Sequence, residues 1–219
     1  MNDPHHGLPQ AGIIGSGIAG LCAAIALRRA GWSCELFERS SFAHEIGAAI
    51  SVTPNATRCL AHWGFDFAKA RPVQNQQLRF MMAKDLDVVF RSEYANLEER
   101  FGYPAWSFHR VDLHRGLRDV ALREQGAGVP AIVRLGCRVE GVDFETGRIV
   151  LANGESVKKD LVIVADGAHV SLNTYFPVFT DRTPELNRRA DDRQFQPSRT
   201  NRAVDLSLPD SNARSHVRS

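Results

Sequence analysis

A glycine-rich turn between an apolar strand and an apolar helix constrains this chain more than any other stretch. The short run Ala11–Ile14 is typical of a buried parallel strand, and GSGIAG follows it directly at residues 15–20. In this pattern the first glycine allows a tight turn, the second lets a pyrophosphate approach the backbone, and the third lets helix and strand pack closely. The free N–H groups that begin the helix then hold the phosphates. The residues predicted at the phosphates are Gly15, Gly17, Ile18, Ala19 and Gly20, and the inward helical face is predicted to be Ile18, Leu21, Cys22, Ile25 and Ala26.

An acidic residue ends the next apolar stretch. Cys34–Phe37 runs into Glu38, about 20 residues beyond the glycines, where the ribose hydroxyls of a dinucleotide need an acceptor. Because strand, helix and acid occur together, the sequence predicts a dinucleotide site rather than a plain structural turn. Arg39, directly after the acid, is either a contact for a 2′-phosphate or a solvated strand end.

Small residues and a short helix come next along the chain. Gly47, Ala48 and Ala49 either let a ligand lie against the backbone or form a close-packed loop. A short helix is predicted from Pro54, because proline suits the first turn of a helix and Gly64 stands just past its end.

The pattern changes to antiparallel strands after this helix. Two apolar runs, Leu78–Met82 and Val88–Phe90, flank a polar turn and predict a hairpin. A hairpin inserted between strand–helix units indicates a second sheet and the start of another domain. The polar stretch Ala95–Tyr103 is expected to be a loop.

A second helix is predicted from Asp112, a good N-cap residue, to Leu122. Arg110 would then stand just ahead of a helix N-terminus, where guanidinium and helix dipole together favour an anion. A solvated surface arginine is the equally weighted alternative. His109 and His114 are expected to be hydrogen-bonded or exposed side chains rather than catalytic bases.

The last patterned stretch contains four predicted strands. They cover residues 131–135, 137–144, 148–151 and 161–165, and turn residues follow the second strand at 145–147 and the third at 153–154. The fourth is fully apolar and ends at Asp166 and Gly167. An acid and a glycine at the carboxyl end of a parallel strand lie at the ligand edge of such a sheet, although Asp-Gly alone is usually a turn.

Composition excludes several other functions. A net charge of +2 is too small to indicate nucleic-acid binding, and no apolar run reaches the ~18 residues of a membrane span. The N-terminal residues lack the pattern of a secretory signal, and the four scattered cysteines show no metal-ligand spacing. We therefore expect a cytoplasmic protein with reduced, mostly buried thiols and no metal site.

Five segments in order resemble the N-terminal part of FAD-dependent aromatic-ring monooxygenases of the salicylate hydroxylase type, in the p-hydroxybenzoate hydroxylase superfamily. They are GSGIAGLCAAIALRRAG, ELFER, IGAAISVTPNATRCLAHWG, FHRVDLHRGL and DLVIVADGAH, and they span nearly all of residues 11–169. The resemblance implies an α/β fold: a Rossmann-like FAD/NAD(P)-binding domain with a parallel sheet, a β-meander and a partial antiparallel substrate-domain insertion.

The same resemblance implies roles and boundaries. Gly15, Gly17 and Gly20 would bind the FAD pyrophosphate and Glu38 the adenosine ribose. The stretch 47–49 would line the cofactor, Arg110 would contact it from the far side, and Asp166-Gly167 would match a motif associated with FAD and the nicotinamide donor. NAD(P)H would reduce the flavin, and O2 would supply the oxygen that enters a small aromatic substrate. The expected division is 8–76 and 106–171 for the FAD-binding domain, 77–105 for the insertion and 172–219 for a disordered tail.

The similarity to that family stops after His169. The pattern should continue into a substrate sheet and a late Gly-Asp motif, but residues 172–219 are polar and without periodicity. Val170-Ser171 can be encoded by the usual start of an intron, which makes a retained intron one hypothesis and a genuine short variant another. We expect an apparently truncated chain that binds FAD weakly or not at all and lacks activity, and no catalytic residue is assigned. The alternatives are an inactive nucleotide-binding fragment and an NAD-dependent dehydrogenase.

Overall fold

The computed structural model describes residues 5–41 and 48–167. All of them belong to the first of two units into which the chain divides, Met1–Leu172, and the second unit lies outside the described residues. The expected tail at 172–219 and the expected cofactor contact at Gly47 therefore also lie outside the described residues.

A four-stranded parallel sheet forms the centre of the described unit. Its strand order is β12 (Leu161–Val164), β1 (Gln10–Ile14), β2 (Ser33–Phe37) and β8 (Ile132–Arg134). Strand β1 pairs in parallel with both β12 and β2, and α1 (Ile18–Arg29) connects β1 to β2. This arrangement confirms the strand, turn, helix and second strand predicted around the glycines. Because the strands are parallel, their carboxyl ends meet at one edge of the sheet.

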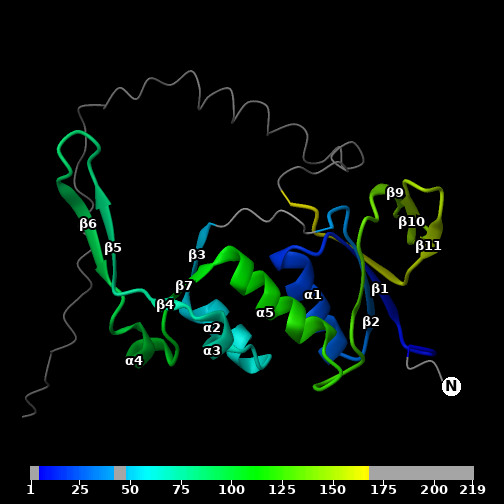
Figure 1. The fold of residues 1–219 in the computed structure, drawn as a ribbon, viewed down its shortest axis with the longest axis horizontal. Coiled ribbons are helices and arrows are strands. Elements are labelled where there is room, and N and C mark those ends of the chain that lie inside the picture. The colour runs from blue at the N-terminus through cyan, green and yellow to red at the C-terminus, as the bar shows by residue number, and fades with distance from the viewer. Residues whose placement is uncertain (1–4, 42–47, 168–219) are drawn as a thin grey trace, which may run out of the picture. The chain divides into compact units, whose positions relative to one another are not determined.

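Helix α1 packs on this sheet, and α5 (Arg110–Leu122) lies beside α1, as Figure 1 shows. The predicted inward face of α1 is partly wrong, because Ala26 is exposed whereas Arg28 is buried. The predicted start of α5 is also wrong. The helix begins at Arg110, with His109 as its N-cap, so Asp112 lies in the first turn instead of capping it.

A smaller antiparallel sheet lies beside α5. It contains β3 (Ala49–Val52), β7 (Trp106–His109) and β4 (Val73–Gln74) in that order. The helices α2 (Pro54–His62) and α3 (Phe67–Ala70) connect β3 to β4, and the proline and glycine at the ends of α2 stand where the sequence predicted them.

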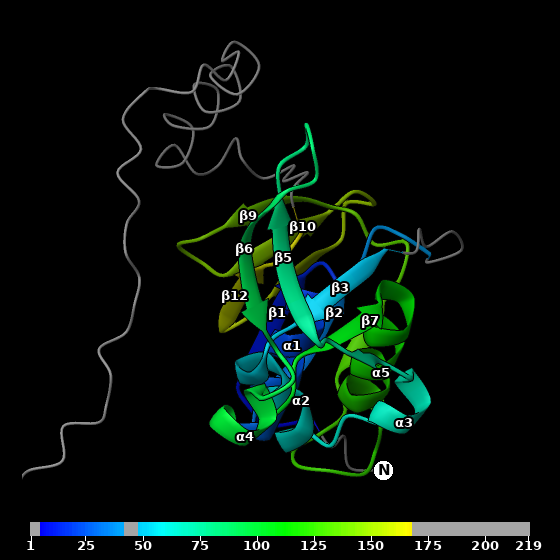
Figure 2. The same ribbon diagram turned by 90° about the vertical axis from the view of Figure 1, so that its left-hand side faces the viewer.

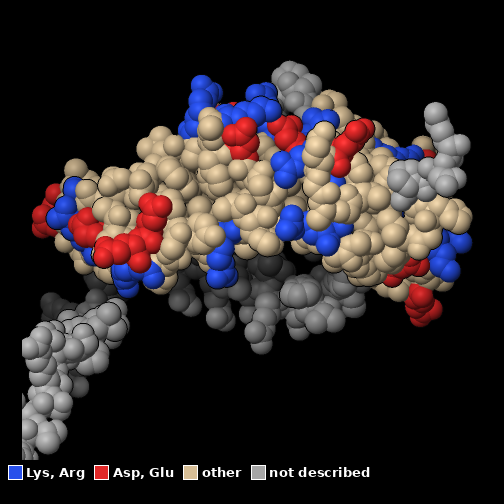
Figure 3. All heavy atoms as spheres, turned by 90° about the horizontal axis from the view of Figure 1, so that it is seen from below, with Lys and Arg blue, Asp and Glu red and all other residues tan. Residues whose placement is uncertain are grey.

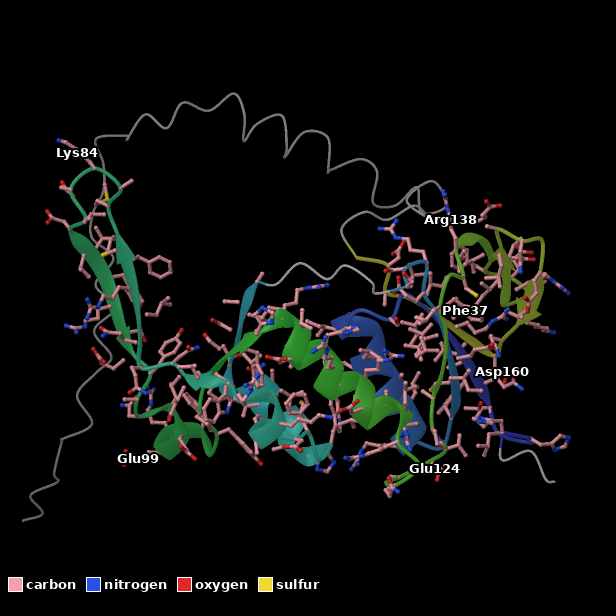
Figure 4. All side chains as sticks on the ribbon, viewed as in Figure 1. Phe37, Lys84, Glu99, Glu124, Arg138 and Asp160 are labelled. Atoms are coloured by element: carbon pink, nitrogen blue, oxygen red, sulfur yellow. The ribbon has the colours of Figure 1, made fainter. Side chains whose placement is uncertain are left out.

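The predicted hairpin is present as β5 (Gln77–Met81) and β6 (Val88–Glu93), a separate two-stranded sheet (Figure 2). Lys84 marks the turn at its tip in Figure 4. The loop expected at 95–103 is wrong in part, because Leu97–Phe101 forms the short helix α4. That helix contains no buried residue, which explains why the sequence shows no apolar periodicity there.

A three-stranded meander completes the unit. It is formed by β9 (Val139–Asp143), β10 (Arg148–Leu151) and β11 (Ser156–Lys158). Phe37 lies between the parallel sheet and this meander, where it joins a buried cluster with Ile14 and the meander's apolar side chains (Figure 4). The parallel sheet, meander and hairpin together confirm the predicted α/β fold class.

Candidate dinucleotide site

The first glycine of the turn lies where the backbones of two neighbouring strand ends approach each other. Gly15 has a φ of 95°, a conformation that L-residues with a side chain rarely adopt. A Cβ atom added there would lie 2.5 Å from the carbonyl oxygen of Ala165, just after β12. The Gly15 N–H also donates to the carbonyl oxygen of Phe37, at 2.8 Å. Gly15 therefore lets the turn sit between the ends of β12 and β2.

The other two glycines have different roles. A Cβ atom at Gly20 would collide with the carbonyl oxygen of Gly15, so Gly20 lets α1 pack directly on the turn. At Gly17, by contrast, a Cβ atom would meet no atom within 4 Å of the described chain, and φ is an ordinary −68°. Gly17 caps α1 without a side-chain hydrogen bond. Nothing in the fold of the described residues requires glycine there, whereas a ligand lying against the backbone would.

The acid predicted to bind ribose lies directly beside the glycine turn. One carboxylate oxygen of Glu38 accepts hydrogen bonds from the Ser16 N–H, at 2.9 Å, and from the Ser16 hydroxyl, at 3.2 Å. The other oxygen accepts from the Ser40 N–H, at 2.9 Å. Glu38 is half-buried and its lone pairs are not exhausted by these donors. The carboxylate is thus fixed at the turn while it retains capacity for hydroxyl donors.

The Asp-Gly pair follows β12 at the same edge. The N–H of Ala165 donates to the carbonyl oxygen of Ile14, at 2.8 Å, and this bond extends the pairing of β12 with β1 up to the turn. The Cα atom of Asp166 would lie 3.1 Å from a Cβ at Gly15. Gly167 has a φ of 83°. The pair is therefore beside the first glycine, as its sequence position predicted.

Helix α5 begins at Arg110. The N–H of Arg110 donates to the carbonyl oxygen of Ala48, at 2.8 Å, and the pairing of β3 with β7 sets Ala49 opposite His109. His114, one helical turn after Arg110, is 3% exposed and its Nε2–H donates to the carbonyl oxygen of Ser16, at 2.8 Å. Arg110 thus begins a helix whose next turn contacts the glycine turn.

The remaining predicted contacts differ in exposure. Ile18 is half-buried, whereas Ala19 and Arg39 are exposed. His114 is a buried, hydrogen-bonded side chain and His109 is exposed, which are the two states expected of these histidines.

Sequence reasoning missed three residues that organise this region: Ser16, His114 and Arg28. The signal for His114 was present, since it lies at helical spacing from Leu117 and Ala121, both buried on the inward face of α5. No comparable signal existed for the Ser16 hydroxyl, whose partner Glu38 lies 22 residues away.

Arg28 fixes α1 to the far end of α5. Its guanidinium is 2% exposed, and burial lowers the pKa of Arg28 below its usual value. Hydrogen bonds from Nη1 and Nη2 offset part of that burial, since the terminal carbonyls of a helix need donors, whereas Nε is buried without a partner. The acceptors are the carbonyl oxygens of Val120, Ala121, Arg123 and Gly128.

The electrostatics of the described surface are mixed. On the face in Figure 3, Lys and Arg side chains intermingle with Asp and Glu side chains, which agrees with the small net charge. Within residues 5–41 and 48–167, no three His, Cys, Asp or Glu side chains are grouped to hold a metal ion. The helices of this part are also too short or too polar to cross a membrane.

The residues at the sheet edge fit an adenine dinucleotide. A pyrophosphate needs a close approach to backbone N–H groups at a helix N-terminus, which the open space at Gly17 permits. A ribose needs a carboxylate acceptor beside that turn, and Glu38 is held there by Ser16. The arrangement can therefore bind the ADP portion of a dinucleotide cofactor.

Comparisons with known proteins agree with this reading. The family of NAD(P)-binding Rossmann-like domains matches residues 13–51. The FAD-dependent monooxygenase cfoG from Aspergillus candidus is 40% identical over 156 residues, which are 71% of this chain and 36% of the relative. Hispidin-3-hydroxylase from Neonothopanus nambi is 36% identical over 164 residues, which are 74% of this chain and 38% of the relative.

A solved structure shows the same relation. Klebsiella pneumoniae HpxO, determined in complex with FAD and uric acid, matches with a TM-score of 0.62 at 30% identity over 82% of this chain and 44% of that protein. The chain thus spans 36–44% of the length of these three proteins.

Proposed function

Because the chain is homologous to the N-terminal part of FAD-dependent aromatic-ring monooxygenases, we propose that it contributes the ADP-binding half of an FAD site to such an enzyme. The activity proposed for the whole protein is hydroxylation of a small aromatic substrate with O2 and NAD(P)H. The observation that carries the proposal is the contact between Glu38 and Ser16 beside the open space at Gly17, which supports Glu38 as the ribose acceptor and Gly17 as part of the pyrophosphate site.

The residues of this chain would bind and orient FAD. The N–H groups that begin α1, from Ile18 to Gly20, would hold the pyrophosphate, and Glu38 would accept hydrogen bonds from the ribose hydroxyls. Ala48, Ala49 and Arg110 would approach the cofactor from α5 and β3, and Asp166-Gly167 from β12. When bound, the flavin supplies the redox chemistry, and the protein supplies position and exclusion of water.

The domain organisation and the location of the protein complete the proposed function. The hairpin region 77–105 is proposed as an insertion into the FAD-binding domain formed by 8–76 and 106–171. It is supported by the separate two-stranded sheet and by β8 and β12, which return to the parallel sheet after it. A cytoplasmic location is supported by the four cysteines, all of which are free thiols.

Equilibrium binding to the purified chain tests the proposal. FAD and ADP are titrated by calorimetry into the wild type and into Gly17→Ala, with NADH as the competing dinucleotide. We expect weak binding of FAD and ADP to the wild type and a loss of at least about tenfold in Gly17→Ala, because the methyl group fills the pyrophosphate position. Binding of NADH but not FAD would contradict the proposal and support a dehydrogenase instead. The hairpin, which interrupts the strand–helix series a dehydrogenase would continue, favours the flavoprotein.

A further inference from the structure

A buried histidine links the glycine turn to the neighbouring helix. The His114 side chain is 3% exposed, comes from α5, and donates from Nε2 to the carbonyl oxygen of Ser16, at 2.8 Å. The two residues are 98 positions apart in the chain. This is a hydrogen bond between a side chain and the backbone of the turn itself, at the peptide that joins Ser16 to Gly17.

The direction of that peptide follows from its geometry. A trans peptide unit is planar, and its C=O and N–H point in opposite directions. Since His114 draws the Ser16 carbonyl toward α5, the N–H of Gly17 must point away from α5. Separately, no described atom lies within 4 Å of a Cβ position on Gly17, so the backbone of the turn is open to a ligand at this residue. An N–H that points away from α5 at such an open residue is available to an anion.

The turn would not hold this orientation by itself. Glycine accepts a wide range of backbone conformations, so a peptide that precedes Gly17 can rotate with little steric resistance. Rotation would turn the Ser16 carbonyl toward the ligand and replace an N–H donor by a repelling oxygen. The bond from the Ser16 N–H to Glu38 restrains the preceding peptide, and the His114 bond restrains this one.

We propose that His114 is a positioning residue that keeps the Ser16–Gly17 peptide turned so that its N–H faces the pyrophosphate of FAD. The inference rests on the proposed function of the glycine turn. It also connects the two sides of the site, because Arg110 lies one turn before His114 on α5. The orientation of the Ser16–Gly17 peptide and the position of Arg110 then both depend on α5.

Substitutions of His114 in the full 219-residue chain test this role. His114→Leu keeps an apolar packing group but removes the donor, and we expect it to weaken binding of FAD and ADP about tenfold. His114→Gln retains an amide donor of similar reach and is expected to stay within about threefold of the wild type. His114→Asn is equally polar but one methylene shorter, so it should behave like the leucine variant. His62→Gln, at an exposed histidine on α2, is the matched control.

A spectroscopic measurement separates positioning from stability. In ¹H–¹⁵N spectra, the Gly17 amide of the wild type and of His114→Gln should move downfield when ADP is added, and that of His114→Asn should not. If His114→Leu does not fold, the glutamine and asparagine variants alone decide the question, because both place an amide at the same buried position.

Several outcomes would overturn the inference. They are unchanged affinity in His114→Leu and His114→Asn, equal loss in His114→Gln and His114→Asn, or a Gly17 amide that does not respond to ADP. In those cases the wild type still binds FAD and the proposed function stands. A wild-type chain that binds neither FAD nor ADP would overturn both proposals together.

Discussion

The glycine-turn edge of the parallel sheet and the β5–β6 hairpin are both made of strands, but they are stabilised in different ways. At the edge, Phe37 is 1% exposed and Leu36 fully buried, and both faces of β1 and β2 are covered by helices or the meander. In the hairpin, Phe80 and Phe90 are 54% and 46% exposed, although their rings pack against each other with 5.5 Å between the ring centroids. Within the part of the chain that the structure describes, the apolar side chains of the hairpin thus remain largely exposed.

The comparison shows that a well-formed strand pair is not by itself a stable unit. An isolated two-stranded hairpin is marginal in water, and large exposed apolar patches on soluble proteins mark surfaces that bind something. The exposed apolar side chains of the hairpin are Leu78, Phe80, Met81, Met82, Leu86, Val88, Val89 and Phe90. The edge, in contrast, has its own core, so substitutions there should report on global stability and those in the hairpin should not.

The largest expected difference is between two phenylalanines. Phe37→Ala should lower the free energy of unfolding by about 3–5 kcal/mol, because it empties the cluster between sheet and meander. Phe80→Ala should lower it by less than about 1 kcal/mol, because that side chain is already half in water. Urea unfolding followed by circular dichroism measures both. Equal losses would show that the hairpin belongs to the same cooperative unit.

The second prediction compares two glycines within the edge. Gly20→Ala should cost about 3 kcal/mol, because its methyl group meets the backbone of Gly15 rather than a movable side chain. Gly17→Ala should lower the free energy of unfolding by no more than about 1 kcal/mol, the cost of alanine at a helix N-cap, since its backbone conformation suits alanine and the space is open. Thermal unfolding without ligand distinguishes them. A large loss in Gly17→Ala would mean that this glycine serves the fold and not a ligand.

The third prediction concerns the buried guanidinium that joins α1 to α5. Arg28→Leu should cost about 2 kcal/mol, because it removes the guanidinium donor from the Val120 carbonyl oxygen and leaves the Ala121 carbonyl oxygen only the Ala131 N–H. The adjacent Arg29→Leu is the control, since Arg29 is exposed and contacts the side chain of His62, which is also exposed. We expect that control within about 0.5 kcal/mol of the wild type in the same urea assay. A neutral Arg28→Leu would show that packing alone holds α1 to α5.

The features that the sequence predicted depend on residues close together in the chain, and the features that it missed depend on residues far apart. The strand, glycine turn and helix were predicted because adjacent residues determine them, and Glu38 because its spacing from the turn is fixed by one crossover. The burial of Arg28 was not predictable, because its acceptors lie 92–100 residues away. The contact between His114 and the turn also depends on how α5 packs on α1.

The errors in element boundaries have the same cause. Asp112 carries a local capping signal, but α5 begins two residues earlier. There the Arg110 N–H donates to the carbonyl oxygen of Ala48, the residue just before β3. In α4 the opposite happens: Glu98 and Glu99 support a helix start electrostatically, but without an apolar face the pattern resembles a loop. Local signals therefore gave the glycine turn correctly, whereas contacts with other elements decide where a neighbouring helix begins.

The smallest expected effect tests whether the Cys34 side chain stays shielded from water at high pH. Burial raises the pKa of the Cys34 thiol from 9.0 to about 11, and Cys34 belongs to β2. Because the folded pKa is raised, the contribution of this thiol is complete below pH 9 and is lost as pH rises toward 11. Between pH 9 and 10 the loss should be about 1 kcal/mol relative to Cys34→Ala, measured by urea unfolding of both proteins at each pH. Parallel pH dependences of the two proteins would show that Cys34 ionises in contact with water, and the contrast between a closed edge and an open hairpin would then weaken.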